Sequence, residues 1–180
     1  GACPNGGQVC VSHGAVPYGD GKSVVHVLSF YGFTNSARDR KARECNEHLI
    51  DLILQYIGQL GQVPVCLCGD FNTHTAASFH LSRALGEGQG QLVDIDRQQA
   101  EAEEREPALT CHQKDTSAGS RIDFIFGNQL MASSALHAEV IPKEQTGIPT
   151  HALVKANLDM HCFNQRVRAF QKARGIPKWE

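Results

Sequence analysis

The chain lacks the features that would place it in several large protein classes. It has no apolar run close to the roughly 18 residues of a transmembrane helix and no secretory signal, so we expect neither a membrane span nor secretion. Its net charge of -2 gives no general attraction to nucleic acid, so any such binding must use a local patch. We therefore expect an intracellular protein, cytoplasmic or nuclear.

Cysteine is present without a metal or disulfide pattern. None of the seven cysteines has zinc-site spacing, and the number is odd. Cys66 and Cys68 fall inside an apolar run, which favours buried free thiols in a reducing compartment. The 180 residues suffice for one domain with a sizeable core. The chain begins with Gly1 rather than Met, which fits a processed chain, an excised domain or part of a longer polypeptide.

The periodicity of apolar residues predicts a mixed α/β chain. A helix is expected after Ser36, which we assign as its N-cap, and Gly61 is expected to end it. A shorter helix is expected near 76–85, and 97–107 is predicted to be a solvated helix or loop. The predicted apolar stripe of the long helix consists of Cys45, Leu49, Leu52, Ile53, Tyr56 and Leu60. Strands are predicted near 8–16, 23–30, 63–68, 109–112, 121–126, 137–141 and 152–158.

The most informative segment is 69–72, with the sequence Gly-Asp-Phe-Asn. It follows the apolar run 63–68, and we expect Gly69 to let the chain leave the sheet. Strand alternation predicts that Asp70 and Asn72 lie on one side and Phe71 on the other. A carboxylate and a carboxamide at a strand end can hold a metal, a water or an oxyanion. A polar turn after a buried strand is the alternative.

A second acidic position lies in the apolar segment 121–126. Alternation turns Asp123 away from the layer formed by its apolar neighbours, so this acid needs a partner. His151, just before the last predicted strand, is our candidate, because a carboxylate beside a histidine fixes its tautomer for acid–base work. The alternatives are a local ion pair between Asp123 and Arg121, and a surface histidine at 151.

Several weaker signals accompany these residues. Tyr31 ends the strand 23–30, and its hydroxyl either lies in water or donates to a phosphate. His74 and His80 are expected at the surface, and Cys111-His112 alone gives no metal signature. A basic cluster at the start of the long helix is either a solvated face or a phosphate contact, with the solvated face favoured. It consists of Arg38, Arg40, Lys41 and Arg43.

Together these segments resemble the endonuclease/exonuclease/phosphatase superfamily, which includes DNase I-like and apurinic-site-endonuclease-like enzymes. The match covers about residues 8–159, and its overall look is also similar to endonuclease domains of non-LTR retrotransposons. The specific segments are Gly69-Asp70-Phe71-Asn72 and Ser120-Arg121-Ile122-Asp123-Phe124-Ile125-Phe126. Phe30-Tyr31-Gly32-Phe33, Thr110 and Pro149-Thr150-His151 add to them.

The resemblance implies a four-layer α/β/β/α sandwich and metal-dependent phosphodiester hydrolysis with Mg²⁺ or Mn²⁺. It makes Asp70 and Asn72 the metal-contacting and water-positioning residues. Asp123 would orient His151 toward the scissile phosphate. Tyr31, Arg121 and Asn72 would contact the substrate. Nucleic acid is the implied partner.

Two departures from the family pattern limit this expectation. Thr150 stands where the family usually has an aspartate, and no glutamate precedes Tyr31, although the family places a metal-binding glutamate on an N-terminal strand. We therefore expect residues 1–160 to be the C-terminal two-thirds of such a domain, with impaired activity, and 161–180 to be a basic tail or linker. A non-catalytic remnant or binding module, and a phosphatase acting on a small-molecule or lipid phosphate, are the alternative functions.

Overall fold

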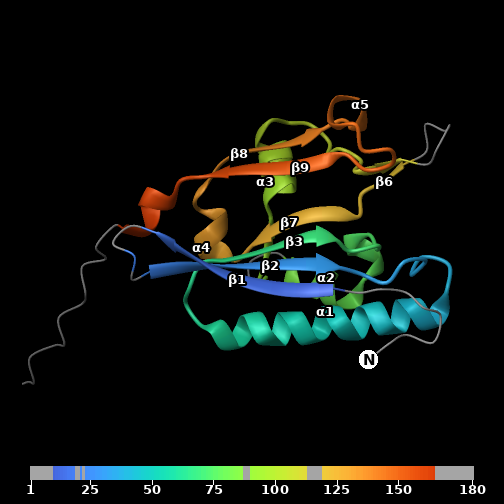
Figure 1. Cartoon of the computed structure of the whole chain (residues 1–180), viewed down its shortest axis with the longest axis horizontal. Helices are drawn as coiled ribbons and strands as arrows, with labels where there is room; N and C mark the ends of the chain where they lie inside the picture. Colours follow the sequence, from blue (N-terminus) through green and yellow to red (C-terminus); the bar gives the residue numbers. More distant parts are fainter. Residues whose placement is uncertain (1–9, 19–20, 22, 87–89, 113–118, 165–180) are drawn as a thin grey trace, which may run out of the picture.

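A mixed five-stranded sheet forms the centre of the molecule (Figure 1). The structure is a computed structural model that describes residues 10–18, 21, 23–86, 90–112 and 119–164. The strand order is β1-β2-β3-β7-β4, with β2 and β3 parallel and the other neighbours antiparallel. The strands are β1 (Cys10–Tyr18), β2 (Ser23–Tyr31), β3 (Val65–Asp70), β7 (Asp123–Gly127) and β4 (Val93–Asp94).

The crossover between the parallel strands is α1 (Arg40–Leu60), which covers one face of the sheet (Figure 1). The predicted helix is present, but two details of the prediction were wrong. Asp39 is the N-cap and accepts from the backbone N–H groups of Lys41 and Ala42, whereas the Ser36 hydroxyl donates to the carbonyl of Asn72. Ser36 does not cap the helix because its hydroxyl is engaged by the loop that follows β3.

The buried face of α1 is also rotated from the predicted stripe. Leu52 and Tyr56 are exposed, and Ile53 is the one stripe residue that is fully buried. The buried positions are Ala42, Asn46, Ile50, Ile53, Leu54 and Ile57. Asn46 belongs to this face because its side chain bonds to the backbone of Phe33 and Phe71, which a pattern of apolar residues cannot reveal.

The central strand β3 is buried on both faces, as its apolar sequence indicates. We expected Gly69 to let the chain leave the sheet, and this was wrong. Gly69 is still paired with Phe30 and Phe124 inside the sheet. Its φ of +143° and the distance of 1.8 Å from an added Cβ to the Phe30 carbonyl oxygen exclude every other residue type. The strand therefore continues to Asp70 and delivers that side chain at its end.

A smaller pair of strands covers the opposite face of the sheet (Figure 1). β8 (Ala135–Ile141) and β9 (Leu153–Leu158) pair antiparallel, and α3 (Ile95–Ala102) packs against β7 and β8. α3 begins with the buried Ile95 and Asp96, and the segment 97–107 that follows is mostly exposed apart from the buried Ala100, which confirms the prediction of a solvated helix or loop. A two-stranded ribbon, β5 (Cys111–His112) with β6 (Gly119–Ser120), takes the place of the longer strand predicted at 109–112.

The remaining elements are short and lie in the connections. They are η1 (Thr75–Ala77), α2 (Phe79–Ala84), α4 (Gln129–Ala132), α5 (Lys143–Thr146) and η2 (Met160–Asn164). In η2, the Phe163 ring packs 5.2 Å from the ring of Tyr18, so the first residues of the expected tail belong to the folded part. Its basic residues from Arg166 onward lie outside the described residues. Among the described helices, none has both the length and the apolar character that crossing a bilayer requires.

Candidate active site

Three of the predicted site residues lie next to one another because neighbouring strands end together. In the sheet register, Asp70 at the end of β3 is opposite Tyr31 at the end of β2. On its other side, Asp70 is opposite Asp123 at the start of β7. The two carboxylates are therefore adjacent cross-strand neighbours. Tyr31 is 40% exposed beside them.

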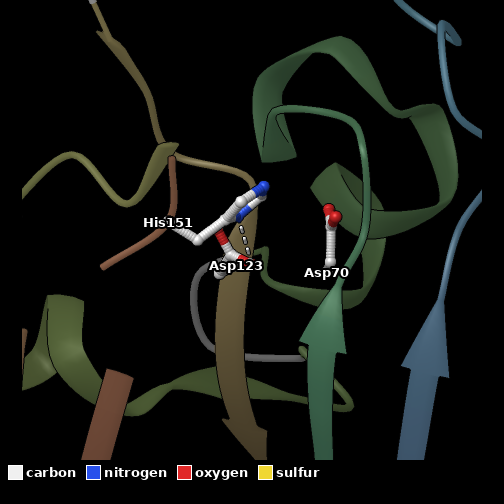
Figure 2. A group of neighbouring side chains, drawn as sticks. All are labelled: Asp70, Asp123 and His151. Carbon is white, nitrogen blue, oxygen red and sulfur yellow. Dashed lines mark hydrogen bonds and ion pairs between the residues drawn. The ribbon is translucent and has the colours of Figure 1, made fainter. Parts of the chain in front are cut away.

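His151 completes the group from a different layer (Figure 2). Its Nδ1 lies 3.0 Å from Oδ2 and 3.2 Å from Oδ1 of Asp123. Because an ionised carboxylate only accepts hydrogen bonds, this contact places the proton on Nδ1 and leaves Nε2 as the outward-facing nitrogen. Asp123 and His151 thus have the geometry of an acid–base dyad.

Thr110 holds both members of this dyad in place. Its Oγ1 accepts from the backbone N–H groups of Ile122 and Asp123, at 3.1 and 3.0 Å. Its carbonyl accepts from the N–H of Ala152, next to His151, at 2.7 Å. Thr110 is fully buried. This one residue links the start of β7 to the loop that carries the histidine.

The charge of Asp70 is unfavourable in the protein without a cation. Burial raises the pKa of its carboxyl, and the nearby Asp123 carboxylate raises it further. The backbone N–H of Asn72, which donates to Asp70 Oδ1 at 2.8 Å, and the nearby His151 partly offset this effect. Ligand atoms of Asp70, Asp123 and His151 all lie within 4.8 Å of one another, so this group can hold a metal ion.

Asn72 reaches the site by a turn rather than by strand alternation. Its φ is +50°, outside the extended region, so the strand has ended before it. Its side-chain Nδ2 donates to the Gly32 carbonyl at 3.2 Å, which fixes the amide and leaves its oxygen as the group available to a ligand. Phe71 points into the core, as expected, and stacks on Phe30 with ring centroids 4.4 Å apart.

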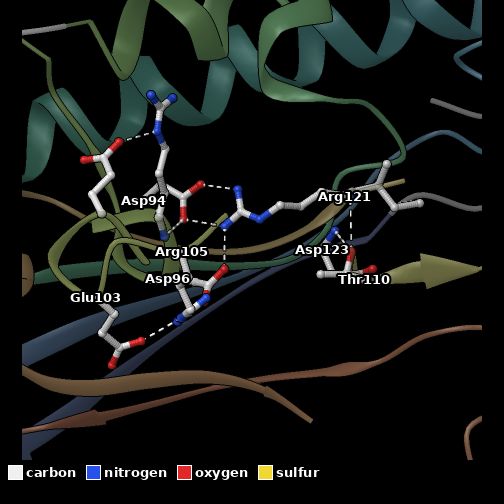
Figure 3. A network of polar contacts seen from close by, with 10 residues as sticks. Asp94, Asp96, Glu103, Arg105, Thr110, Arg121 and Asp123 are labelled. Atoms are coloured by element: carbon white, nitrogen blue, oxygen red, sulfur yellow. Dashed lines mark hydrogen bonds and ion pairs between the residues drawn. The ribbon is translucent and has the colours of Figure 1, made fainter. Parts of the chain in front are cut away.

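Arg121 does not contact Asp123, so the alternative of a local ion pair between them was wrong (Figure 3). Its guanidinium donates to both carboxylate oxygens of Asp94, at 2.5 and 2.7 Å, and to Asp96 at 3.2 Å. Arg121 is only 7% exposed and lies over the Phe124 ring. A buried guanidinium bonded to two acids has little capacity left for the substrate contact that we predicted.

The weaker candidates lie in surface positions. His74 caps η1, because its Nδ1 accepts from the backbone N–H of Ala76. Nδ1 of His80 lies 3.3 Å from Oδ1 of Asp51 in α1. In the basic cluster, Arg40 pairs with Glu44, and Arg43 donates to backbone carbonyls of the preceding loop. These contacts favour the solvated-face interpretation of the cluster.

A depression of about 490 Å³ beside Asn72 is lined in part by Arg43, His74 and Ile122.

One neighbour of the site was missed. Cys111 forms an isolated β-bridge with His151, and its Sγ lies 3.8 Å from Nε2 of that histidine. Burial raises the pKa of the Cys111 thiol, and the charges of Asp123 and Asp70 raise it further. The sequence placed Cys111 only beside His112, and its 40-residue separation from His151 concealed the contact.

Comparisons with known proteins identify the fold. No protein-family model and no curated protein matches the chain. The solved catalytic domain of Xenopus laevis APE2 is similar, with a TM-score of 0.65 and 21% identity over 85% of this chain and 55% of that one. An AP endonuclease from Archaeoglobus fulgidus has a TM-score of 0.58 and 17% identity over 85% of this chain and 72% of that one. A mannosyl-6-phosphatase from Bacteroides thetaiotaomicron has a TM-score of 0.53 and 18% identity over 83% of this chain and 52% of that one.

These likenesses show that the chain has the DNase I-like fold of these solved nucleases and phosphatases, as the sequence predicted. The chain spans about half the length of the APE2 catalytic domain and of the Bacteroides phosphatase. At this level of identity the comparison establishes the architecture, and the chemistry has to be argued from the residues.

Proposed function

We propose that this chain is part of a metal-dependent phosphodiester hydrolase that acts on nucleic acid. The observation that carries the proposal is the Asp123–His151 dyad beside Asp70 at the end of the sheet. Asp123 holds the tautomer of His151, and the outward Nε2 is then free to exchange a proton or a hydrogen bond with a phosphate oxygen. Asp70 and Asn72 would position the attacking water.

The residues present fit a divalent cation. The buried Asp70 carboxylate has a raised pKa, and a nearby cation would reverse the electrostatic cost of its charge. Asp70 and the amide oxygen of Asn72 offer the oxygen ligands that Mg²⁺ or Mn²⁺ takes, with waters and substrate oxygens completing the shell. A bound ion would supply neutralisation of the phosphate charge. Thr150 has no carboxylate to contribute.

Several features of the substrate and the domain belong to the same proposal. The depression lined by Asn72, His74 and Arg43 would receive the nucleic-acid backbone, and Tyr31 would donate to a phosphate. Residues 1–160 would be the C-terminal two-thirds of the hydrolase domain, and the protein would act inside the cell. The activity of these 180 residues alone would be weak, because the family's glutamate ligand has no counterpart before Tyr31.

The experiment is single-turnover cleavage with protein in excess over labelled duplex DNA, with and without an abasic site, in Mg²⁺ or Mn²⁺. We expect Asp70→Asn and His151→Ala each to lower the rate by about 10²–10⁴-fold, the usual contribution of an acid–base group. Asp51→Asn is the matched control, because Asp51 of α1 contacts His80 of α2 and no residue of the proposed site, and it should retain the rate. Cleavage that persists in Asp70→Asn would reject the assignment of the site.

A phosphatase is the second candidate, because a mannosyl-6-phosphatase has the same fold. The same protein and variants should be assayed with mannose 6-phosphate. Release of inorganic phosphate from this substrate, without cleavage of DNA and with loss in Asp70→Asn, would favour the phosphatase. Absence of both reactions in the wild-type protein would favour a binding module.

A further inference from the structure

The outer edge of β1 has no partner among the described strands (Figure 1). On its other side, β1 pairs with β2 along its whole length, from Cys10 opposite Tyr31 to Tyr18 opposite Ser23. Eight of the nine residues of β1 are exposed, and only Tyr18 is partly covered. Charged side chains usually protect such an edge, but β1 has no Asp, Glu, Lys or Arg, and its one proline, Pro17, lies near the end. The unpaired backbone groups of β1 are therefore open to another strand.

An apolar flank of α1 adjoins this edge. The Tyr56 hydroxyl lies 3.0 Å from Nδ1 of His13, so the flank that carries Tyr56 faces β1. Leu49, Leu52, Tyr56 and Leu60 follow one another at the 3–4 spacing of a helix that packs against another helix. The fold uses this stripe only in part, because Leu52 and Tyr56 remain 48% and 38% exposed. An open strand edge and an uncovered helix flank thus lie side by side.

We propose that two copies of this chain associate through the edge of β1 and this flank of α1. A two-fold axis beside the edge places β1 antiparallel to its copy and brings the two α1 helices next to each other. One symmetric interface then covers both features, because each copy supplies the same strand and the same helix. A partner that offers only a strand would leave Leu52 and Tyr56 in water. The uncharged β1 also has no like charges to repel its own copy.

The size of this surface suits a weak dimer. A strand of nine residues and a helix of 21 residues are both about 30 Å long. A strand layer and a helix layer together are roughly 20 Å deep. The strip then measures roughly 600 Å² per partner, at the lower end of the range for specific interfaces. We therefore expect dimers that dissociate on dilution.

Association is tested by sedimentation equilibrium of the 180-residue chain over about a hundredfold range of concentration. Reducing agent is present throughout, because Cys10 is an exposed thiol. The mass should rise from 19.6 kDa toward twice that value. Leu52→Lys on the flank and Val16→Lys on the edge should each weaken association by at least about tenfold, since each lysine meets like charge from its copy.

Phe79→Lys is the matched control and should leave association unchanged. Phe79 is 68% exposed, so its replacement also introduces a lysine for an exposed apolar side chain. It belongs to α2, which contacts α1 through His80 and Asp51. Asp51 and Tyr56 are five positions apart, about 140° around the helix axis, so α2 and β1 adjoin different flanks of α1. Loss of the dimer in Phe79→Lys alone would move the interface to α2 and overturn the proposal.

Hydrogen exchange distinguishes edge pairing from other modes of association. A new strand neighbour protects backbone N–H groups, so residues 10–18 should exchange more slowly at high protein concentration than at low concentration. Leu52→Lys, shown to be folded by its unfolding temperature, should lose this difference. A monomer at every concentration, a dimer that both lysine variants leave intact, or a dimer without slower exchange in 10–18 would each overturn the proposal. Protection of 10–18 in a monomer would show that another part of the chain covers the edge. Neither readout uses nuclease activity, so the dimer and the proposed function fail independently.

Discussion

Replacing Arg121 with methionine should lower the stability of the protein strongly without affecting substrate contacts. Arg121, Asp94 and Asp96 are 7%, 5% and 1% exposed, and three hydrogen bonds join the guanidinium to the two acids (Figure 3). Removing the cation leaves two buried carboxylates without their main partner. Breaking a buried ion pair from one side costs about 3–5 kcal/mol. For a chain of this length that corresponds to a fall in Tm of about 6–20 °C.

The measurement is urea unfolding followed by circular dichroism, with Arg40→Gln as the control. Arg40 also pairs with an acid, Glu44, but its side chain is 89% exposed and the pair is screened by water, so the control should change stability little. Restoring neutrality with Asp94→Asn and Asp96→Asn in the Arg121→Met background should recover part of the loss, because the buried charges are then gone. Equal stability of Arg121→Met and Arg40→Gln, with a raised KM in the former, would refute this reasoning and restore Arg121 as a substrate-binding residue.

Two further predictions concern the end of β3. Asp70→Asn should raise Tm at pH 7 while it removes activity, because burial and Asp123 raise the pKa of Asp70 and the folded state therefore pays for its ionisation. That cost is absent below the ordinary pKa of an aspartate, about 3.9, and grows as pH rises toward the folded pKa. The gain in Tm of Asp70→Asn should therefore vanish near pH 3.5. An equal gain at pH 7 and pH 3.5 would contradict this prediction. Gly69→Ala should prevent the sheet from forming correctly, since the new Cβ would lie 1.8 Å from the Phe30 carbonyl oxygen. Gly147→Ala is the control, because Gly147 has a φ of +71° but open space around it, and it should lower the free energy of unfolding in urea by only about 1–2 kcal/mol.

The sequence contained enough information for the strand–helix–strand unit and for the pairing of Asp123 with His151. The first follows from apolar periodicity that ends at Gly61 and resumes in the run 63–68, and the second from strand alternation, which turns Asp123 away from its apolar neighbours so that this acid needs a partner. The partner of Arg121 could not be found in this way. Arg121 and Ile122 precede β7 and do not belong to it, so strand alternation does not apply to them. The true partners, Asp94 and Asp96, come from β4 and α3, 27 and 25 residues earlier.

The helix errors have a different cause. Asp39, rather than Ser36, caps α1, because Ser36 hydrogen-bonds to the loop after β3 instead. The buried stripe of α1 includes Asn46, a polar residue that a hydrophobic pattern assigns to the solvent side. In both cases a tertiary hydrogen bond outweighs a local preference. Cys111 was overlooked because its contact with His151 comes from backbone pairing between β5 and a segment 40 residues later.

These exceptions share one location and explain how the site is held. The apolar core fixes the strands, whereas two buried polar residues, Asn46 and Thr110, fix the segments next to the active site. Asn46 accepts from the N–H of Phe33 at 3.1 Å and donates to the Phe71 carbonyl at 2.9 Å, so α1 ties together the loops after Tyr31 and Asp70. Thr110 does the same for the segments that carry Asp123 and His151. Since an unpaired buried polar group is costly, these bonds define loop positions more sharply than apolar contacts would. The carboxylates and the histidine therefore meet because of residues that themselves do no chemistry.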